Sequence, residues 1–241
     1  MFLMYYPTIS FYFHESYILV IIGMILSLAA SAMVKGTFSK YAKVRNVEGM
    51  TGAEAAQRVL NRAGIYDVRI EHVPGSLSDH YDPRAKVLRL SDSVYGQASV
   101  AAVGVAAHEC GHAIQHAQGY APLKLRSAFI PVANFGSRIA WPLILLGMFF
   151  GGESANWFVY LGVIAFSLAV VLTLITLPVE FNASKRAIQM ITESGMMQDD
   201  EIQSAKKVLS AAAMTYVASA ATAILQLVRI LLLTGGRRRN D

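Results

Sequence analysis

The sequence is poor in cysteine and in charge. Cys110 is the single cysteine among 241 residues, which excludes an internal disulfide framework. Only 15% of the residues are charged and 54% are hydrophobic, a balance too apolar for an ordinary soluble domain of this length. Zinc-finger and RNA-binding signatures are missing, and the net charge of +5 is small. We therefore expect a membrane protein that contacts lipid and does not bind nucleic acid.

Several apolar runs approach the roughly 20 residues that a helix needs to cross a bilayer. The first, residues 17–34, lacks the preceding basic segment and the cleavage site of a signal peptide, so it predicts a retained transmembrane helix. The second and third spans are expected at residues 127–150 and 157–177, separated by a polar turn at 151–156. A last helix is expected from about Glu201 to Leu233.

Basic residues suggest how the chain is oriented. Four of them follow the first apolar run at once (Lys35, Lys40, Lys43 and Arg45), and the loops before Leu125 and after Pro178 are basic too. By the positive-inside rule these loops are cytoplasmic and the N-terminus is outside. Four simple crossings would leave the arginines at 237–239 outside, against that rule. We therefore expect a final helix that is short, broken or packed against the site.

A less apolar segment, residues 35–121, lies between the first two spans. Thr51-Gly-Ala-Glu54 is a capping box that predicts a helix to about Ala63. Residues 66–73 and 86–90 read as two strands of a β-hairpin, joined by a long turn-rich loop. A helix is then predicted from about Gln97 to Gln118.

That helix contains the motif H-E-x-x-H at His108, Glu109 and His112. Side chains four residues apart lie on one face of a helix, so both imidazoles can reach one Zn²⁺ at about 2.0–2.1 Å. The Glu109 carboxylate can then take a proton from a zinc-bound water. The alternative is two ordinary helix histidines. His116 lies about 12 Å along the helix from His108, too far to share the ion, and Cys110 on another face is expected only to pack.

Glu180 is the candidate for the third ligand. A catalytic zinc usually has three protein ligands and an open position. Pro178 is predicted to end the third apolar run, which places Glu180 at the start of a new helix over 181–190. A carboxylate next to the membrane is unfavourable unless it is paired or exposed. The alternative is an ordinary N-terminal glutamate favoured by the helix dipole.

The motif pair His108-Glu-Cys-Gly-His112 and Glu180-Phe-Asn-Ala-Ser184 resembles that of membrane zinc metallopeptidases of the gluzincin type. More closely, nearly the whole chain is similar to the YugP-like neutral zinc metallopeptidases of bacteria. The stretches that carry this similarity are residues 78–84, 86–91, 104–113, 177–184 and 213–217. The resemblance implies that His108, His112 and Glu180 bind Zn²⁺ and that Glu109 is the catalytic base.

One position departs from the wider class, which has an aspartate four residues after the glutamate ligand. This chain has Ser184 there. Such an aspartate commonly supports a histidine ligand. Ser184 can still form a hydrogen bond, and Asn182 or Asp92 are alternatives for the supporting role.

The expected activity is hydrolysis of peptide bonds in membrane or membrane-proximal proteins, at the cytoplasmic surface. Tyr216 is the first candidate to donate a hydrogen bond to the oxyanion, because a phenol in an apolar helix needs a partner. His80 and Arg186 are alternatives, and Tyr216 also suits a membrane interface. The strand at 87–90 is expected to pair with an extended substrate as an added edge strand.

The sequence predicts a mainly α membrane protein: a transmembrane helical bundle with a small α+β zincin-like metallopeptidase segment containing a β-hairpin. Residues 1–34 are expected to form a transmembrane helix, residues 35–123 the zincin-like segment and residues 124–178 two transmembrane helices. Residues 179–207 are expected to form the Glu180 helix with its connection, and residues 208–241 a last membrane helix with a basic tail. The oligomeric state and any membrane-protein partner stay open.

Two other classes of function are weighed against the peptidase. The first is a zinc-binding scaffold or regulator that cleaves little. The second is a transporter-like bundle, suggested by a polar stripe on the last helix, although the chain has no internal repeat. The stripe either forms hydrogen bonds between helices or lines a wet catalytic cavity. It consists of Thr215, Ser219, Thr222, Gln226 and Arg229.

Overall fold

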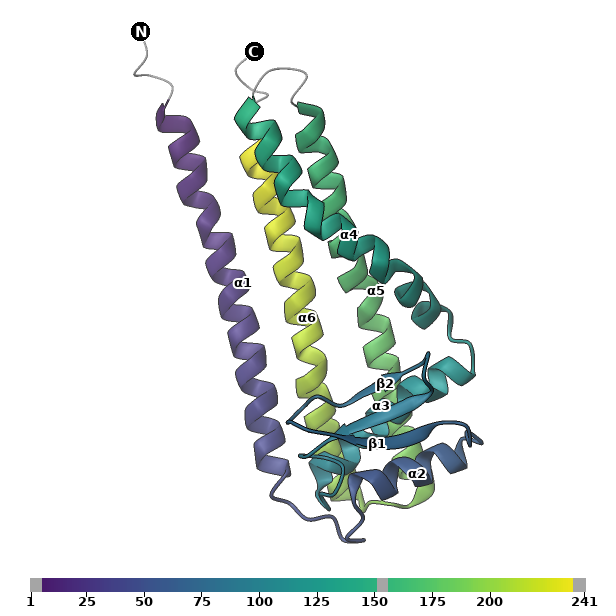
Figure 1. Cartoon of the computed structure of the whole chain (residues 1–241). Helices are drawn as coiled ribbons and strands as arrows, with labels where there is room; N and C mark the ends of the chain where they lie inside the picture. Colours follow the sequence, from purple (N-terminus) through teal and green to yellow (C-terminus); the bar gives the residue numbers. More distant parts are fainter. Residues whose placement is uncertain (1–5, 151–155, 236–241) are drawn as a thin grey trace. The chain divides into compact units, whose positions relative to one another are not determined.

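The computed structural model describes residues 6–150 and 156–235 (Figure 1). They form two compact units, which we name by their content. Among the described residues, the helical unit comprises 6–29, 125–150, 156–176 and 216–235, and the α+β unit comprises 30–124 and 177–215. Most of the turn predicted at 151–156 and the arginines at 237–239 lie outside the described residues.

Four long helices are apolar enough to cross a membrane, which confirms a mainly α, multi-pass architecture. They are α1 (Tyr6–Tyr41), α4 (Ala121–Phe150), α5 (Asn156–Ser194) and α6 (Asp199–Gly235). Of the three alternatives predicted for the last helix, short and broken are wrong, since α6 runs for 37 residues. The third alternative, packing beside the site, is not contradicted, because Ala205 of α6 lies against Gly104 on the helix of the H-E-x-x-H motif. The prediction for Pro178 is wrong. Pro178 does not end a helix, because it lies inside α5, which has 39 residues in total. Long membrane helices tolerate the loss of the backbone hydrogen bond that a proline removes.

Small residues bring the helices of the helical unit close together. A Cβ atom on Gly136 would lie 2.6 Å from the carbonyl oxygen of Ala165, so α4 and α5 meet there. The hydroxyl of Thr222 on α6 donates a 3.1 Å hydrogen bond to the carbonyl oxygen of Gly23 on α1. Close approach and polar bonds of this kind hold helices together in lipid. Of the residues in the polar stripe, Thr222 therefore forms a hydrogen bond between helices.

The α+β unit is built around α3 (Val100–Ala117), which packs against α2 (Gly52–Arg62) and the sheet (Figure 1). The capping box of α2 is confirmed: the Thr51 amide donates to Glu54 at 2.8 Å and the Glu54 amide to Thr51 at 3.3 Å. Ser99 caps α3 by accepting from the Ala102 amide. Small buried side chains on α3 let its neighbours approach from several sides.

The sheet has the strand order β1-β3-β2. Its strands are β1 (Arg69–Val73), β2 (His80–Asp82) and β3 (Val87–Ser91). The hairpin predicted between the first and last of these is wrong, because β1 runs parallel to β3. The hairpin is formed instead by β2 and β3, which are antiparallel. Since β3 has a neighbour on each side, it cannot take an added substrate strand, and that prediction is also wrong.

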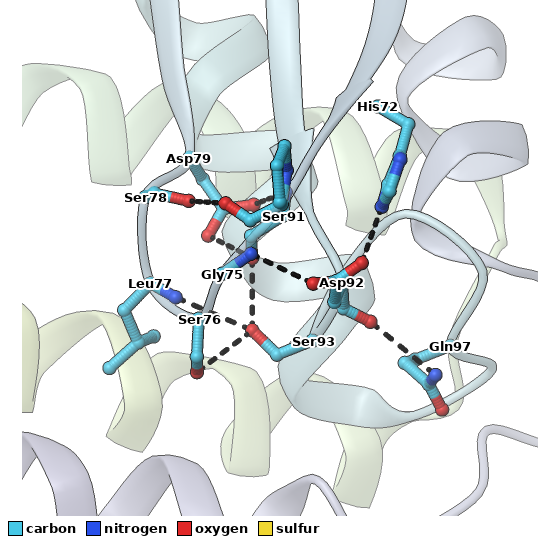
Figure 2. A network of polar contacts seen from close by, with 11 residues as sticks. His72, Gly75, Ser76, Leu77, Ser78, Asp79, Ser91, Asp92, Ser93 and Gln97 are labelled. Atoms are coloured by element: carbon cyan, nitrogen blue, oxygen red, sulfur yellow. Dashed lines mark hydrogen bonds and ion pairs between the residues drawn. The ribbon is translucent and has the colours of Figure 1, made fainter.

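The loop between β1 and β2 crosses the end of β3 and is fastened there by two aspartates (Figure 2). Asp79 accepts hydrogen bonds from the amide and the hydroxyl of Ser91, at 2.7 and 2.9 Å. Asp92 accepts from the Gly75 amide at 2.8 Å and pairs with His72 at 2.6 Å. The Gly75 amide and then His72 lower the pKa of Asp92. These bonds hold β2 against the sheet, so Asp92 is not available to support a zinc ligand.

Candidate metal centre

Three predicted ligands converge in the α+β unit. The Glu180 carboxylate oxygen Oε2 lies 3.4 Å from Nε2 of His108 and 3.6 Å from Nε2 of His112. All three ligand atoms lie within 4.8 Å of one another. Ligands at about 2.0–2.1 Å from a tetrahedral zinc are about 3.4 Å apart. The spacing therefore fits one small divalent ion held by two imidazoles and a carboxylate.

A glycine inside the motif allows α5 to reach this position. A Cβ atom on Gly111 would lie only 2.5 Å from the carbonyl oxygen of Ala183, which is less than any real contact. The backbones of α3 and α5 therefore almost touch where Gly111 meets Ala183. This close crossing brings Glu180 of α5 to the two histidines of α3. The crossing buries the Glu180 side chain to 3% exposure, while those of His108 and His112 keep 13% and 12%.

Ser184 supports the first histidine. Its hydroxyl lies 3.1 Å from Nδ1 of His108 and leaves Nε2 facing Glu180. Ser184 thus occupies the supporting position that the aspartate holds in the wider class. The two alternatives to Ser184 have other partners. Asp92 bonds to His72, and Asn182 accepts a hydrogen bond from Gln115, with none to His108 among the described residues.

Gln115 supports the second histidine, and the sequence reasoning did not single it out. Its side-chain oxygen Oε1 lies 3.1 Å from Nδ1 of His112, and its amide nitrogen donates to the Val179 carbonyl oxygen at 2.8 Å. The same nitrogen donates to Asn182 at 3.0 Å. Gln115 is fully buried. A polar residue three positions after His112, on a helix of small apolar side chains, is the signal that would have pointed to it.

Negative charge concentrates around His112. Burial alone would lower its pKa, but the Glu180 carboxylate 3.6 Å away, the charge of Glu109 and the Gln115 hydrogen bond together raise it. The Glu109 side chain is itself largely buried. Surroundings that favour a proton on His112 also favour a metal cation bound to this imidazole in place of that proton.

The other residues considered for the site have different surroundings. His116 lies outside the ligand cluster and accepts or donates a 2.8 Å hydrogen bond with the Tyr81 hydroxyl. Cys110 is buried and burial raises the pKa of its thiol, which confirms a packing residue. His80 contacts the Ser78 carbonyl oxygen at 2.9 Å, and Arg186 donates to Asn182 at 2.7 Å. Tyr216 belongs to the helical unit, so its role as a donor stays a prediction.

Comparison with known proteins decides the family. Residues 16–235 match the model of the family described as "Putative neutral zinc metallopeptidase". The chain belongs to this family. The Bacillus subtilis (strain 168) protein named "Putative membrane protease YugP" is 48% identical to this chain over 223 residues. That match covers 92% of this chain and 98% of the relative. No solved structure matches the chain.

Proposed function

We propose that this member of the neutral zinc metallopeptidase family is an endopeptidase that hydrolyses peptide bonds of membrane or membrane-proximal proteins. The observation that carries the proposal is the convergence of His108, His112 and Glu180, with Glu109 next to His108 in the sequence. The donor set of two imidazoles and one carboxylate is that of catalytic zinc sites, which leave a position open.

The residues have distinct roles in the proposed reaction. His108, His112 and Glu180 would hold Zn²⁺, which supplies a Lewis acid able to lower the pKa of water towards about 7. Glu109 accepts the proton of the attacking water and passes it to the leaving amine. Glu109 follows His108 directly on α3, so the proposed base and two of the proposed ligands belong to one helix. Tyr216 remains the proposed donor to the oxyanion, with His80 and Arg186 as the alternatives.

The substrate is proposed to reach the site at the cytoplasmic face of the cell membrane. The site belongs to the α+β unit, and the segments entering and leaving this unit are rich in lysine and arginine. The edge strands β1 and β2, rather than the central β3, each leave one backbone edge for an extended peptide.

The first test is the substitution Glu109→Gln in the full-length protein in detergent. The variant keeps the ligands but loses the base, so we expect normal zinc content and cleavage of a casein substrate reduced by about 10²–10⁴-fold. The matched control is Glu193→Gln, which changes an exposed carboxylate on α5. Normal cleavage by Glu109→Gln would refute the proposed mechanism. Zinc binding by the wild type without cleavage of casein or of itself would favour the scaffold.

A second test concerns the third ligand. In Glu180→Ala the site keeps only two protein ligands, so we expect both zinc binding and cleavage to be lost. Zinc content is measured by atomic absorption after dialysis, and folding is checked by circular dichroism. Zinc binding as tight as that of the wild type would show that the third ligand lies elsewhere.

A further inference from the structure

We propose that Gln115 is a positioning residue: it fixes the tautomer and orientation of His112 and ties this histidine to the helix that carries Glu180. The inference rests on the proposed metal site and assigns a role to a residue outside the ligand set. Gln115 touches neither the ion nor the substrate in this scheme, and it acts through His112.

The orientation of the Gln115 amide follows from what surrounds it. The Val179 carbonyl oxygen accepts hydrogen bonds and cannot donate, so the group 2.8 Å away must be the amide nitrogen of Gln115. The amide oxygen must then face Nδ1 of His112, at 3.1 Å. An amide oxygen only accepts, so the hydrogen must be on Nδ1 of His112. The lone pair of a neutral His112 is therefore on Nε2, the atom that faces Glu180.

The chain of bonds continues to a fixed positive charge. Nε of Arg186 donates to the side-chain oxygen of Asn182 at 2.7 Å, and the Gln115 amide donates to the same oxygen at 3.0 Å. A guanidinium has no acceptor, so it fixes which end of the Asn182 amide faces Gln115. Arg186 also stacks 5.7 Å from the Tyr120 ring. Two groups of fixed polarity, Arg186 and the Val179 carbonyl, thus set the direction of every bond leading to His112.

The position of these groups makes the link specific to the metal centre. Val179 directly precedes Glu180 on α5, and Gln115 lies one helical turn after His112 on α3. A single buried side chain therefore joins the backbone beside one ligand to the ring of another. Ser184 cannot give the same control to His108, because a hydroxyl either donates or accepts.

The test is zinc affinity, measured by competition with a chelator, for substitutions that separate the bond Gln115 accepts from the bonds it donates. Gln115→Leu removes all three bonds, and we expect zinc to bind about 10–100-fold more weakly. Gln115→Glu keeps an acceptor for His112 but loses the donor to Val179 and Asn182. We expect it to recover most of the zinc affinity while its unfolding temperature stays below that of the wild type. A purely structural residue would lose zinc equally in both variants.

The second arm of the test uses Asn182. Its oxygen only accepts, so Asn182→Asp keeps both bonds and Asn182→Leu loses both. We expect the aspartate variant to bind zinc like the wild type and the leucine variant to bind it more weakly. The control for loss of a buried amide is Asn46→Leu, because the Asn46 side chain bonds only to the Met50 backbone among the described residues. It should lower the unfolding temperature and leave zinc affinity unchanged.

A spectroscopic readout tests the tautomer itself. With ring-¹⁵N-labelled histidine in the zinc-loaded protein, His112 should show a slowly exchanging Nδ1 proton that is lost in Gln115→Leu. Unchanged zinc affinity together with an unchanged Nδ1 proton in Gln115→Leu would overturn the inference. These measurements do not use cleavage. A protein that binds zinc but cleaves nothing would therefore refute the proposed function and leave the role of Gln115 standing.

Discussion

At the scale of single residues, the two histidines of the motif are supported differently. His112 is bonded to an amide oxygen that can only accept, whereas His108 is bonded to the hydroxyl of Ser184. A serine contributes a neutral hydrogen bond, which is about half as strong as one to a carboxylate. The first histidine of this chain is therefore less firmly held than an aspartate at position 184 would hold it.

This difference leads to a prediction for position 184. Ser184→Ala removes the partner of Nδ1, and we expect zinc to bind about tenfold more weakly. Ser184→Asp supplies a charged acceptor and should bind zinc at least as tightly as the wild type. Affinities are measured by chelator competition, with Ser204→Ala as the control, because that hydroxyl bonds only to the Asp200 backbone oxygen among the described residues. Equal affinity of Ser184→Ala and the wild type would contradict this account.

The sequence was informative at this scale where chemistry is local. His108, Glu109 and His112 share one turn or two of a single helix, so their spacing alone fixes how they lie. Glu180 and Ser184 were identified from a second motif that resembles a known one. The role of Gln115 could not be predicted from the sequence, because its partners Val179 and Asn182 are more than 60 residues away along the chain. A buried glutamine on a helix has no recognisable function until the crossing helix is known.

At the scale of elements, the site depends on how closely α3 and α5 cross. Gly111 lies between Cys110, which packs into the core, and the ligand His112. The backbone of Ala183 fills the space where a side chain at 111 would be. Packing therefore restricts which side chains fit at the two variable positions of the H-E-x-x-H motif in this chain.

We therefore predict that Gly111→Ala disrupts the metal site. The added methyl group must push α5 away from α3, which separates Glu180 from the histidines and costs about 1–3 kcal/mol of stability. The control is Gly104→Ala on the same helix, where a Cβ atom would lie 3.4 Å from the Cβ of Ala205. Both variants gain helix propensity, so only the first should lose zinc and unfold at a lower temperature. Zinc affinity and thermal unfolding are followed by chelator competition and circular dichroism.

Elements were predicted better than their pairing. The capping box of α2 and the extent of α3 follow from local signals, and the structure confirms them. The parallel pairing of β1 with β3 depends instead on the loop that Asp79 and Asp92 fasten across the end of β3. Pro178 was misread for a related reason. Its local preference ends a helix, but the surroundings of a long membrane helix override that preference.

At the scale of the whole molecule, the chain combines two kinds of interior. In the α+β unit a continuous apolar core surrounds α3. In the four candidate spans only 11–22% of the most apolar windows is buried, so their large side chains need a lipid environment. Helices α1, α4, α5 and α6 each contribute residues to both units. Helix α5, which carries the proposed ligand Glu180, is therefore also a candidate membrane helix. For this reason we expect cleavage to depend on an intact bilayer or detergent shell.

The last prediction concerns which side of the membrane the site faces. If each candidate span crosses once, positions 78 and 198, on either side of the span pair α4 and α5, lie on the same side. The positive-inside rule makes that side cytoplasmic. Single cysteines are introduced as Ser78→Cys and Gln198→Cys, both at exposed positions, and as Ser154→Cys between the second and third predicted spans. A membrane-impermeant maleimide added to intact cells should label only Ser154→Cys.

The native chain provides its own control for this experiment. Cys110 is buried and the pKa of its thiol is raised, so the wild type should stay unlabelled even in permeabilised cells and react only after denaturation. Permeabilisation should then expose Ser78→Cys and Gln198→Cys to the reagent. Labelling of both in intact cells would place the metal centre outside and reverse the orientation. Labelling of one without the other would mean that α4 and α5 do not cross as a pair, since two crossings must return the chain to the side from which it started.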